Sequence, residues 1–179
     1  GGTGDDSLYG GGGKGGDDND ILDGGAEGKG GDTVNYYDAI SAVSVDLVLG
    51  TATGGAGSDT LIDIENVTGS AYADLITGND ESNDLFGDGG GDTLLGAGGD
   101  DNLYDSGYVD GVADANVIDG GSGNDNFFIG SAEAIDSSML TGGSGSDRYY
   151  LDASNLSAIT VADFSAGAGG DVIDINSLI

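Results

Sequence analysis

The stretch GSAYADLIT GNDESNDLF GDGGGDTLL GAGGDDNLY, residues 69–104, divides into four consecutive units of nine residues. Each unit carries a carboxylate or its amide at the sixth position and an apolar residue at the eighth. The sixth positions are Asp74, Asn83, Asp92 and Asp101, and the eighth are Ile76, Leu85, Leu94 and Leu103. A fixed period of this kind is typical of proteins that stack short structural repeats. The period therefore predicts the architecture, and the aspartates predict the chemistry.

Further copies of the unit lie outside this stretch. GGTGDDSLY starts at Gly1, GGAGSDTLI at Gly54, GGSGNDNFF at Gly120 and GGSGSDRYY at Gly142. Inserted glycines between residues 10 and 31 leave the register of that part open. The start, GGTGDD, does not resemble a signal peptide, and the first unit is already in phase at Gly1, so we expect a fragment cut within a repeat region.

The composition favours a partner that is a cation. The chain of 179 residues has 33 acidic and 3 basic residues, a formal net charge of −30, which disfavours nucleic acid and anionic membrane surfaces as partners. No apolar run approaches the ~20 residues of a membrane-spanning helix. With 39 glycines and no proline, the chain suits tight turns better than a disordered acidic tail, which would not keep Asp and Leu/Ile in register.

The unit divides into a six-residue turn and a three-residue strand. Alternate strand residues face opposite ways, so the eighth residue points inward. Two units then make one coil of eighteen residues, and turns in register are two units apart: Asp74 stacks over Asp92, and Asn83 over Asp101. Each gap between stacked turns gathers carboxylates and backbone carbonyls, which are oxygen donors that Ca²⁺ prefers, whereas zinc or copper prefers nitrogen or sulfur and magnesium keeps its waters.

The unit GGxGxDxUx, where U is apolar, resembles the calcium-binding repeat of RTX (repeat-in-toxin, haemolysin-type) proteins of bacteria, and the resemblance covers nearly the whole chain. It implies an all-β fold, a right-handed parallel β-roll (a β-solenoid) with a C-terminal β cap. Residues 59–79 resemble the link between repeat blocks of large RTX proteins. The ending VADFSAGAGGDVIDI, residues 161–175, resembles the cap of serralysin-type modules.

We expect a single domain over residues 1–179, built from five segments. They are an N-terminal repeat block (1–37), a strand insertion (38–53), the main repeat ladder (54–128), an insertion (129–141), and the last repeats with the cap (142–179). Alternation of Val43, Val45, Leu47 and Leu49 predicts a half-buried strand, and residues 51–57 are expected as a turn or loop.

The expected metal ligands are aspartate side chains at or near sixth positions, and glycines that supply carbonyls and permit the turns. The aspartates are Asp6, Asp17, Asp20, Asp32, Asp59, Asp74, Asp92, Asp101, Asp125, Asp147 and Asp171. The glycines are Gly2, Gly4, Gly55, Gly57, Gly87, Gly96, Gly121, Gly123, Gly143 and Gly145. Stacked turns of this kind would hold roughly five to eight Ca²⁺ ions.

Several units depart from the family pattern. Asn83 and Asn116 replace the sixth-position aspartate, and Tyr72 and Glu81 replace the fourth-position glycine. These departures indicate weaker or empty calcium sites in the units that carry them.

The resemblance implies a module that stays unfolded for type I export and folds where calcium is plentiful, in a secreted or cell-surface protein. The chain has no His and no Cys, so nucleophile systems that need them are absent and we expect no enzyme activity. Two alternatives stay open: a surface-layer or adhesin segment that works by lateral self-association, or the C-terminal module of a secreted enzyme or toxin. Aromatic residues at eighth and ninth positions indicate packing, or else an exposed row for a partner or sugar.

Overall fold

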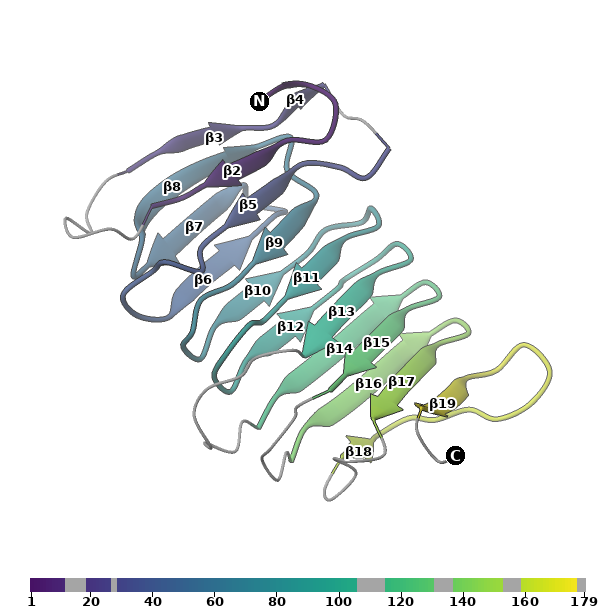
Figure 1. The fold of residues 1–179 in the computed structure, drawn as a ribbon. Coiled ribbons are helices and arrows are strands. Elements are labelled where there is room, and N and C mark those ends of the chain that lie inside the picture. The colour runs from purple at the N-terminus through teal and green to yellow at the C-terminus, as the bar shows by residue number, and fades with distance from the viewer. Residues whose placement is uncertain (12–18, 27–28, 106–114, 131–136, 153–158, 177–179) are drawn as a thin grey trace.

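The computed structural model describes residues 1–11, 19–26, 29–105, 115–130, 137–152 and 159–176. Over these residues the protein is all-β, with two long sheets and a short two-stranded one (Figure 1). In that part of the chain no helix is long and apolar enough to span a bilayer.

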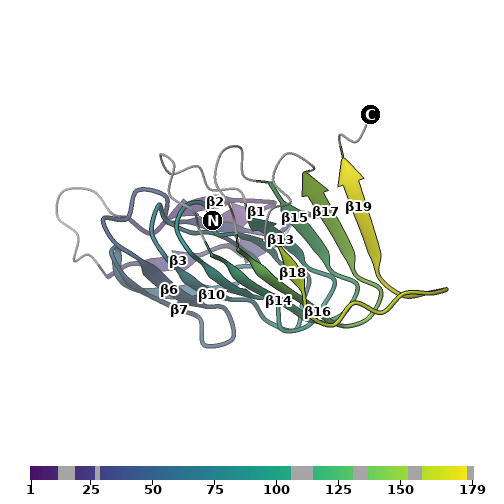
Figure 2. The ribbon, with the colours of Figure 1, turned by 90° about the horizontal axis from the view of Figure 1, so that it is seen from below.

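Along most of the chain the strands alternate between the two long sheets, but residues 43–62 contribute three successive strands to one of them. The nine-stranded sheet has the order β18 (Thr160–Val161), β16 (Met139–Ser144), β14 (Val117–Ser122), β12 (Thr93–Leu95), β10 (Leu75–Thr77), β6 (Val43–Asp46), β7 (Thr51–Gly54), β8 (Gly57–Ile62) and β3 (Ile21–Asp23). The eight-stranded sheet has the order β19 (Val172–Asn176), β17 (Arg148–Asp152), β15 (Asn126–Ile129), β13 (Asn102–Asp105), β11 (Asp84–Phe86), β9 (Asn66–Thr68), β5 (Thr33–Asn35) and β2 (Ser7–Tyr9). The short sheet pairs β1 (Gly2–Thr3) with β4 (Gly25–Ala26). Seen at right angles, the two long sheets form separate layers (Figure 2).

The pairing register confirms that units two apart stack on one another. Leu75 of β10 pairs with Thr93 of β12, and Asp84 of β11 pairs with Asn102 of β13, in parallel and eighteen residues apart. The next pairs, such as Leu103 with Phe127, span a longer interval but keep the same register positions. The chain therefore passes from one sheet to the other and back once every two units.

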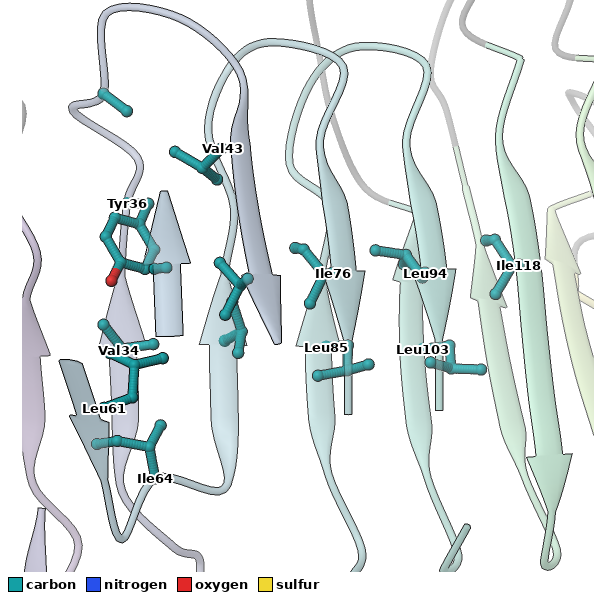
Figure 3. Close-up of a cluster of buried hydrophobic side chains, with 14 of the residues drawn as sticks. Val34, Tyr36, Val43, Leu61, Ile64, Ile76, Leu85, Leu94, Leu103 and Ile118 are labelled. Atoms are coloured by element: carbon teal, nitrogen blue, oxygen red, sulfur yellow. The ribbon is translucent and has the colours of Figure 1, made fainter. Parts of the chain in front are cut away.

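The core lies between the two long sheets and is built from the eighth positions. Ile76 and Leu85 are fully buried, and so are their counterparts in the neighbouring coils. Figure 3 shows Ile76, Leu94 and Ile118 in one row, with Leu85 and Leu103 in a second row below it. Each such side chain contributes about 1.5–3 kcal/mol by leaving water, so the period of the sequence directly sets the stabilising core.

Ninth-position aromatic rings form a stack on the outer face of the eight-stranded sheet. The centroids of Phe86 and Tyr104 are 4.1 Å apart, those of Tyr104 and Phe128 4.6 Å, and those of Phe128 and Tyr150 4.8 Å, with planes within 8° of parallel. The inner rings are covered on both faces by their neighbours. Because a sugar stacks on a ring face, this geometry favours the packing role over a sugar-binding row.

One part of the sequence interpretation is wrong, because residues 51–62 form strands rather than a loop followed by a repeat turn. β7 pairs antiparallel with both β6 and β8, and the glycines at 54–57 make the hairpin between β7 and β8. The strand of β6 ends at Asp46, so Val48 and Leu49 are exposed and Leu49 does not face the core. A nine-residue period predicts parallel stacking of units and carries no signature of an inserted antiparallel strand, which is why the pattern missed β7.

The C-terminal strand predictions are confirmed in shortened form. β18 covers Thr160–Val161 and β19 covers Val172–Asn176. Leu140 is buried at an eighth position, as the frame starting at residue 133 predicts. Residues 131–136, 158 and 177–179, which belong to the predicted insertion and tail, lie outside the described residues.

Candidate metal centre

Sixth-position side chains point into the molecule rather than along its rim. Positions six and eight of a unit share one face of the extended backbone, so the carboxylate follows the core residue inward. Asp101 and Asp125 have no exposed surface, and Asp74, Asp92 and Asp147 retain at most 3%. The acidic groups of the repeat are therefore buried charges, which need compensation by donors, protons or cations.

These side chains form two columns, one for each long sheet, and each column residue directly precedes a strand of that sheet. The first column, before the eight-stranded sheet, contains Asp6, Asp32, Glu65, Asn83, Asp101, Asp125, Asp147 and Asp171. The second column, before the nine-stranded sheet, contains Asp74, Asp92, Asn116 and Ser138. The predicted stacking of Asp74 over Asp92 and Asn83 over Asp101 is confirmed.

Along most of the first column the backbone N–H of one residue donates to the side chain of the next coil, whereas the Glu65 N–H donates back to the Asp32 carbonyl. The N–H of Asn83 donates to Asp101 Oδ1 at 2.8 Å, that of Asp101 to Asp125 Oδ1 at 2.9 Å, and that of Asp125 to Asp147 Oδ1 at 3.0 Å. The series extends to Asp171, and at the other end Asp32 donates to Glu65 Oε2. One oxygen of each carboxylate thus joins neighbouring coils.

The second column has the same hydrogen bonds but changes its chemistry along the molecule. Asp74 accepts from the Val43 N–H at 2.7 Å, and Asp92 accepts from the Asp74 N–H at 2.8 Å. Further on, Asn116 accepts from Asp92 and Ser138 Oγ from Asn116. The column therefore passes from carboxylate to amide to hydroxyl while its geometry is kept.

The glycine at the first position of the unit makes room for this buried side chain. A Cβ at Gly87 would lie 2.3 Å from Asp92 Oδ2, and a Cβ at Gly96 would lie 2.3 Å from Asp101 Oδ2. Gly120 and Gly142 stand in the same relation to Asp125 and Asp147. At Gly87 and Gly96, both expected to supply carbonyls, the absence of a side chain has this separate steric reason.

Two turns, residues 69–74 and 78–83, are closed by their own side chains, and we call them the closed turns. In the first, Ser70 Oγ donates to Asp74 Oδ1 at 2.7 Å and accepts from the Tyr72 N–H at 3.1 Å, and the Ser70 N–H donates to Asp74 Oδ2. In the second, Asn79 Oδ1 accepts from the Glu81 N–H at 2.8 Å, and the Asn79 N–H donates to Asn83 Oδ1 at 2.8 Å. A polar side chain at the second position thus organises each closed turn.

Four other turns, residues 87–92, 96–101, 120–125 and 142–147, have a different backbone, and we call them the open turns. Their second and fourth residues all have positive φ: 68° and 109° at residues 88 and 90, 77° and 100° at 97 and 99, 94° and 137° at 121 and 123, and 89° and 147° at 143 and 145. The fourth residue is always glycine, and it lies directly on the backbone of the turn before it. A Cβ at Gly123 would lie 1.6 Å from the Gly99 carbonyl oxygen.

In three open turns the second carboxylate oxygen is buried with no hydrogen-bond donor. These oxygens are Oδ2 of Asp101, Asp125 and Asp147, and Asp32 Oδ2 of the N-terminal block is in the same state. Burial raises the pKa of Asp101 to about 7 and that of Asp125 to about 6, and it also raises the pKa of Asp147. Binding of a proton or a cation would therefore stabilise each of these buried carboxylates.

The remaining predicted ligands are distributed unevenly. Asp20 and Asp59, which precede the paired strands β3 and the end of β8, repeat the column step: the Asp20 N–H donates to Asp59 Oδ1 at 2.9 Å. Asp59 Oδ2 also accepts from the buried Tyr36 hydroxyl at 3.0 Å. Gly55 and Gly57 belong to the β7–β8 hairpin region. Gly2 lies in β1 and its N–H donates to Asp6 Oδ2 at 2.7 Å, and Gly4 has a φ of 114°. Asp17 lies outside the described residues.

The oxygen-only donor set and the buried carboxylates fit calcium, but side-chain carboxylates alone would not complete a calcium site. Among the described residues, no three His, Cys, Asp or Glu side chains converge to form a metal cluster. A cation between stacked turns would therefore depend on backbone carbonyls as well as on sixth-position carboxylates. Ca²⁺ accepts such mixed oxygen ligands in flexible geometry.

Sequence reasoning missed the residues that close two of the turns. The side chains of Ser70 and Asn79 at second positions, and the amide of Asn83, carry that role. The signal was the replacement of the fourth-position glycine by Tyr72 and Glu81 in the same units, since these residues cannot readily adopt the positive φ of an open turn. Glu65 was also missed as a member of the first column, because it is a glutamate in a unit without the glycine pattern.

A scan of the chain against protein-family models finds no matching family, and a search of curated proteins finds no relative.

Proposed function

We propose that this chain is a calcium-binding repeat module, a right-handed parallel β-roll with a C-terminal cap, that folds when it binds Ca²⁺. The observation that carries the proposal is the set of donor-free, buried carboxylate oxygens of Asp101, Asp125 and Asp147. They lie in successive coils of one column, so the need for positive charge is repeated along the molecule. When bound, Ca²⁺ would supply that charge and draw stacked turns together.

The net charge of the chain supports the same proposal. With a formal charge of −30, the folded form without cations suffers self-repulsion in addition to the cost of its buried carboxylates. Cations that bind only the folded state neutralise this charge, and their binding free energy adds to the free energy of folding. The calcium-free chain is accordingly expected to be expanded and the calcium form compact.

Contacts at the end of the stack support the proposal of a cap. The carboxylate of Asp163 accepts from the backbone N–H groups of Gly142 and Gly143 at 2.9 and 2.8 Å. The N–H of Asp171, which in an internal coil would donate to the next column residue, donates instead to the Ser165 carbonyl at 2.7 Å. The ladder of the first column is thus closed within the chain, as repeat proteins require at their ends.

In its biological setting, the proposed module belongs to a secreted or cell-surface bacterial protein. It would remain unfolded during type I export, with the secretion machinery as partner, and fold where calcium is abundant. It would stabilise the protein that carries it, which includes the case of a secreted enzyme or toxin.

Size-exclusion chromatography with light scattering tests the proposal. The chain is compared in chelator and in ~1–10 mM calcium, a range suited to extracellular calcium modules. We expect an expanded chain in chelator and a compact monomer in calcium, with a matching gain of β signal in far-UV circular dichroism. An identical elution volume and spectrum in both buffers would refute the proposal.

A second candidate, lateral assembly in a surface layer or adhesin, is favoured by one surface feature. Leu75, Val117 and Met139 are 39–45% exposed at equivalent positions of β10, β14 and β16 on the outer face of the nine-stranded sheet, and Thr93 of β12 holds the position between Leu75 and Val117. Exposed apolar side chains aligned on one face in this way are suited to contact with another protein surface. Discrete oligomers or sheets in calcium, in the light-scattering experiment, would favour this candidate over a monomeric folding module.

A further inference from the structure

The closed turn of residues 78–83 holds an amide where three of the open turns hold a carboxylate, that of Asp101, Asp125 or Asp147, with an oxygen that lacks a donor. Asn83 Nδ2 donates to the Glu65 carbonyl oxygen at 2.8 Å and to Asn79 Oδ1 at 3.3 Å. Asn83 Oδ1 accepts from the Asn79 N–H at 2.8 Å. Both ends of the Asn83 side chain are therefore paired, although the residue is 1% exposed.

Asp101 occupies the next place in the same column and has the opposite balance. Its Oδ1 accepts from the Asn83 N–H at 2.8 Å, but its Oδ2 is buried with no donor. Asn and Asp have nearly the same shape and differ in whether the second group is an NH₂ donor or a charged oxygen. The two residues take the same backbone hydrogen bond in the column, although their turns differ in backbone, and they differ in their demand for positive charge.

We propose that the Asn83 amide is a built-in substitute for a cation, so that its turn holds no calcium in a module where the open turns of Asp101, Asp125 and Asp147 require it. The inference rests on the proposed function and adds to it which turn is independent of metal. Nδ2 faces two accepting oxygens, the Glu65 carbonyl and Asn79 Oδ1. A carboxylate in its place would put three oxygens together with no donor between them.

The neighbouring closed turn extends this metal-independent region to a full coil. Asp74 is paired by Ser70 Oγ, by the Ser70 N–H and by the Val43 N–H. The two closed turns precede β10 and β11, which follow one another in the chain. One complete coil, residues 69–86, is thus hydrogen-bonded without a cation and adjoins the open turns that begin at residue 87.

Calcium stoichiometry in matched variants tests the inference. Asn83→Asp is compared with wild type and with Asp101→Asn, which makes the reverse change in the next coil, by equilibrium dialysis and metal analysis at saturating calcium. We expect Asn83→Asp to bind one more ion per chain and to need more calcium to fold, and Asp101→Asn to bind one fewer. Ser44→Asp, which adds a charge at an exposed position of β6, is expected to leave the count unchanged.

The outcomes separate this inference from the proposed function. If the wild-type chain binds no calcium, the proposed function fails and the inference fails with it. If wild type binds calcium but Asn83→Asp has the wild-type count, the inference is wrong and the function stands. If Asn83→Asp does not fold in saturating calcium, a cation has not replaced the amide, and the inference is again wrong.

Discussion

The closed turn of residues 78–83 and the open turn of residues 96–101 occupy the same edge of the molecule, one coil apart, yet they are stabilised differently. The closed turn is held by its own side chains, with Asn79 and Asn83 pairing its polar groups. The open turn has positive φ at Ala97 and Gly99 and leaves Asp101 Oδ2 without a donor. The difference teaches that one nine-residue period can hold both a self-sufficient turn and one that demands positive charge.

The comparison predicts its largest effect at the fourth position of an open turn. Gly123→Ala would place a Cβ 1.6 Å from the Gly99 carbonyl oxygen at a residue with φ of 137°. We expect a loss of about 3 kcal/mol or more in the free energy of unfolding, from strain and from separation of the stacked turns. Urea unfolding in saturating calcium measures it.

Tyr72→Ala is the matched control, since Tyr72 holds the fourth position of a closed turn. Its side chain is 46% exposed, and the contact that matters there, Tyr72 N–H to Ser70 Oγ, uses the backbone. We expect a change below about 1 kcal/mol. Equal losses in the two variants would show that the distinction between open and closed turns has no energetic meaning.

The pH dependence of folding in calcium-free buffer is the next largest expected effect. Burial raises the pKa of Asp101 to about 7 and of Asp125 to about 6, above the unfolded value of about 3.9. A raised folded-state pKa adds stability that is fully present below the unfolded pKa and is lost as pH rises through the folded pKa. The folded fraction should therefore fall between about pH 4 and 7, as measured by circular dichroism.

Saturating calcium should reverse this slope. Protons then compete with the metal for the same carboxylates, so acidification is expected to release calcium and weaken the fold. Asp101→Asn, which removes one titrating group, is expected to flatten the calcium-free profile. A profile with the same slope in both buffers would mean that protons and calcium do not act on the same groups.

The smallest expected effect belongs to the other closed turn. Ser70→Ala removes the hydroxyl that donates to Asp74 Oδ1 and accepts from the Tyr72 N–H. We expect a loss of about 1 kcal/mol in the free energy of unfolding. The loss should be of similar size with and without bound calcium. Urea unfolding measures it, under conditions where each form is folded. Ser44→Ala, at an exposed strand position, should stay within about 0.5 kcal/mol. A loss seen only in calcium would place a metal in this turn and contradict its closed character.

Much of the fold followed from the period of the sequence, but the site followed only in part. The eighth positions predicted the buried rows of Ile76 and Leu85, and the two-unit coil predicted the register of Asp74 with Asp92. The same period placed Asp59 beside Asp20 and buried Leu61, but it missed β7, which was expected as a loop. β7 pairs with its sequence neighbours β6 and β8 through two hairpins, and a period that predicts parallel stacking carries no information about an inserted antiparallel strand.

The sequence by itself determined the stacking period, the inward apolar rows and an oxygen-only, acidic chemistry, because these depend on strand alternation and residue type within each unit. The tertiary structure decided which buried oxygens find a donor. Asn83 and Asp101 fill equivalent positions, yet the Asn83 amide is paired by the Glu65 carbonyl of the coil before it, whereas Asp101 Oδ2 meets no donor. The Glu65 carbonyl lies eighteen residues from Asn83, so this pairing exists only once the coils are stacked.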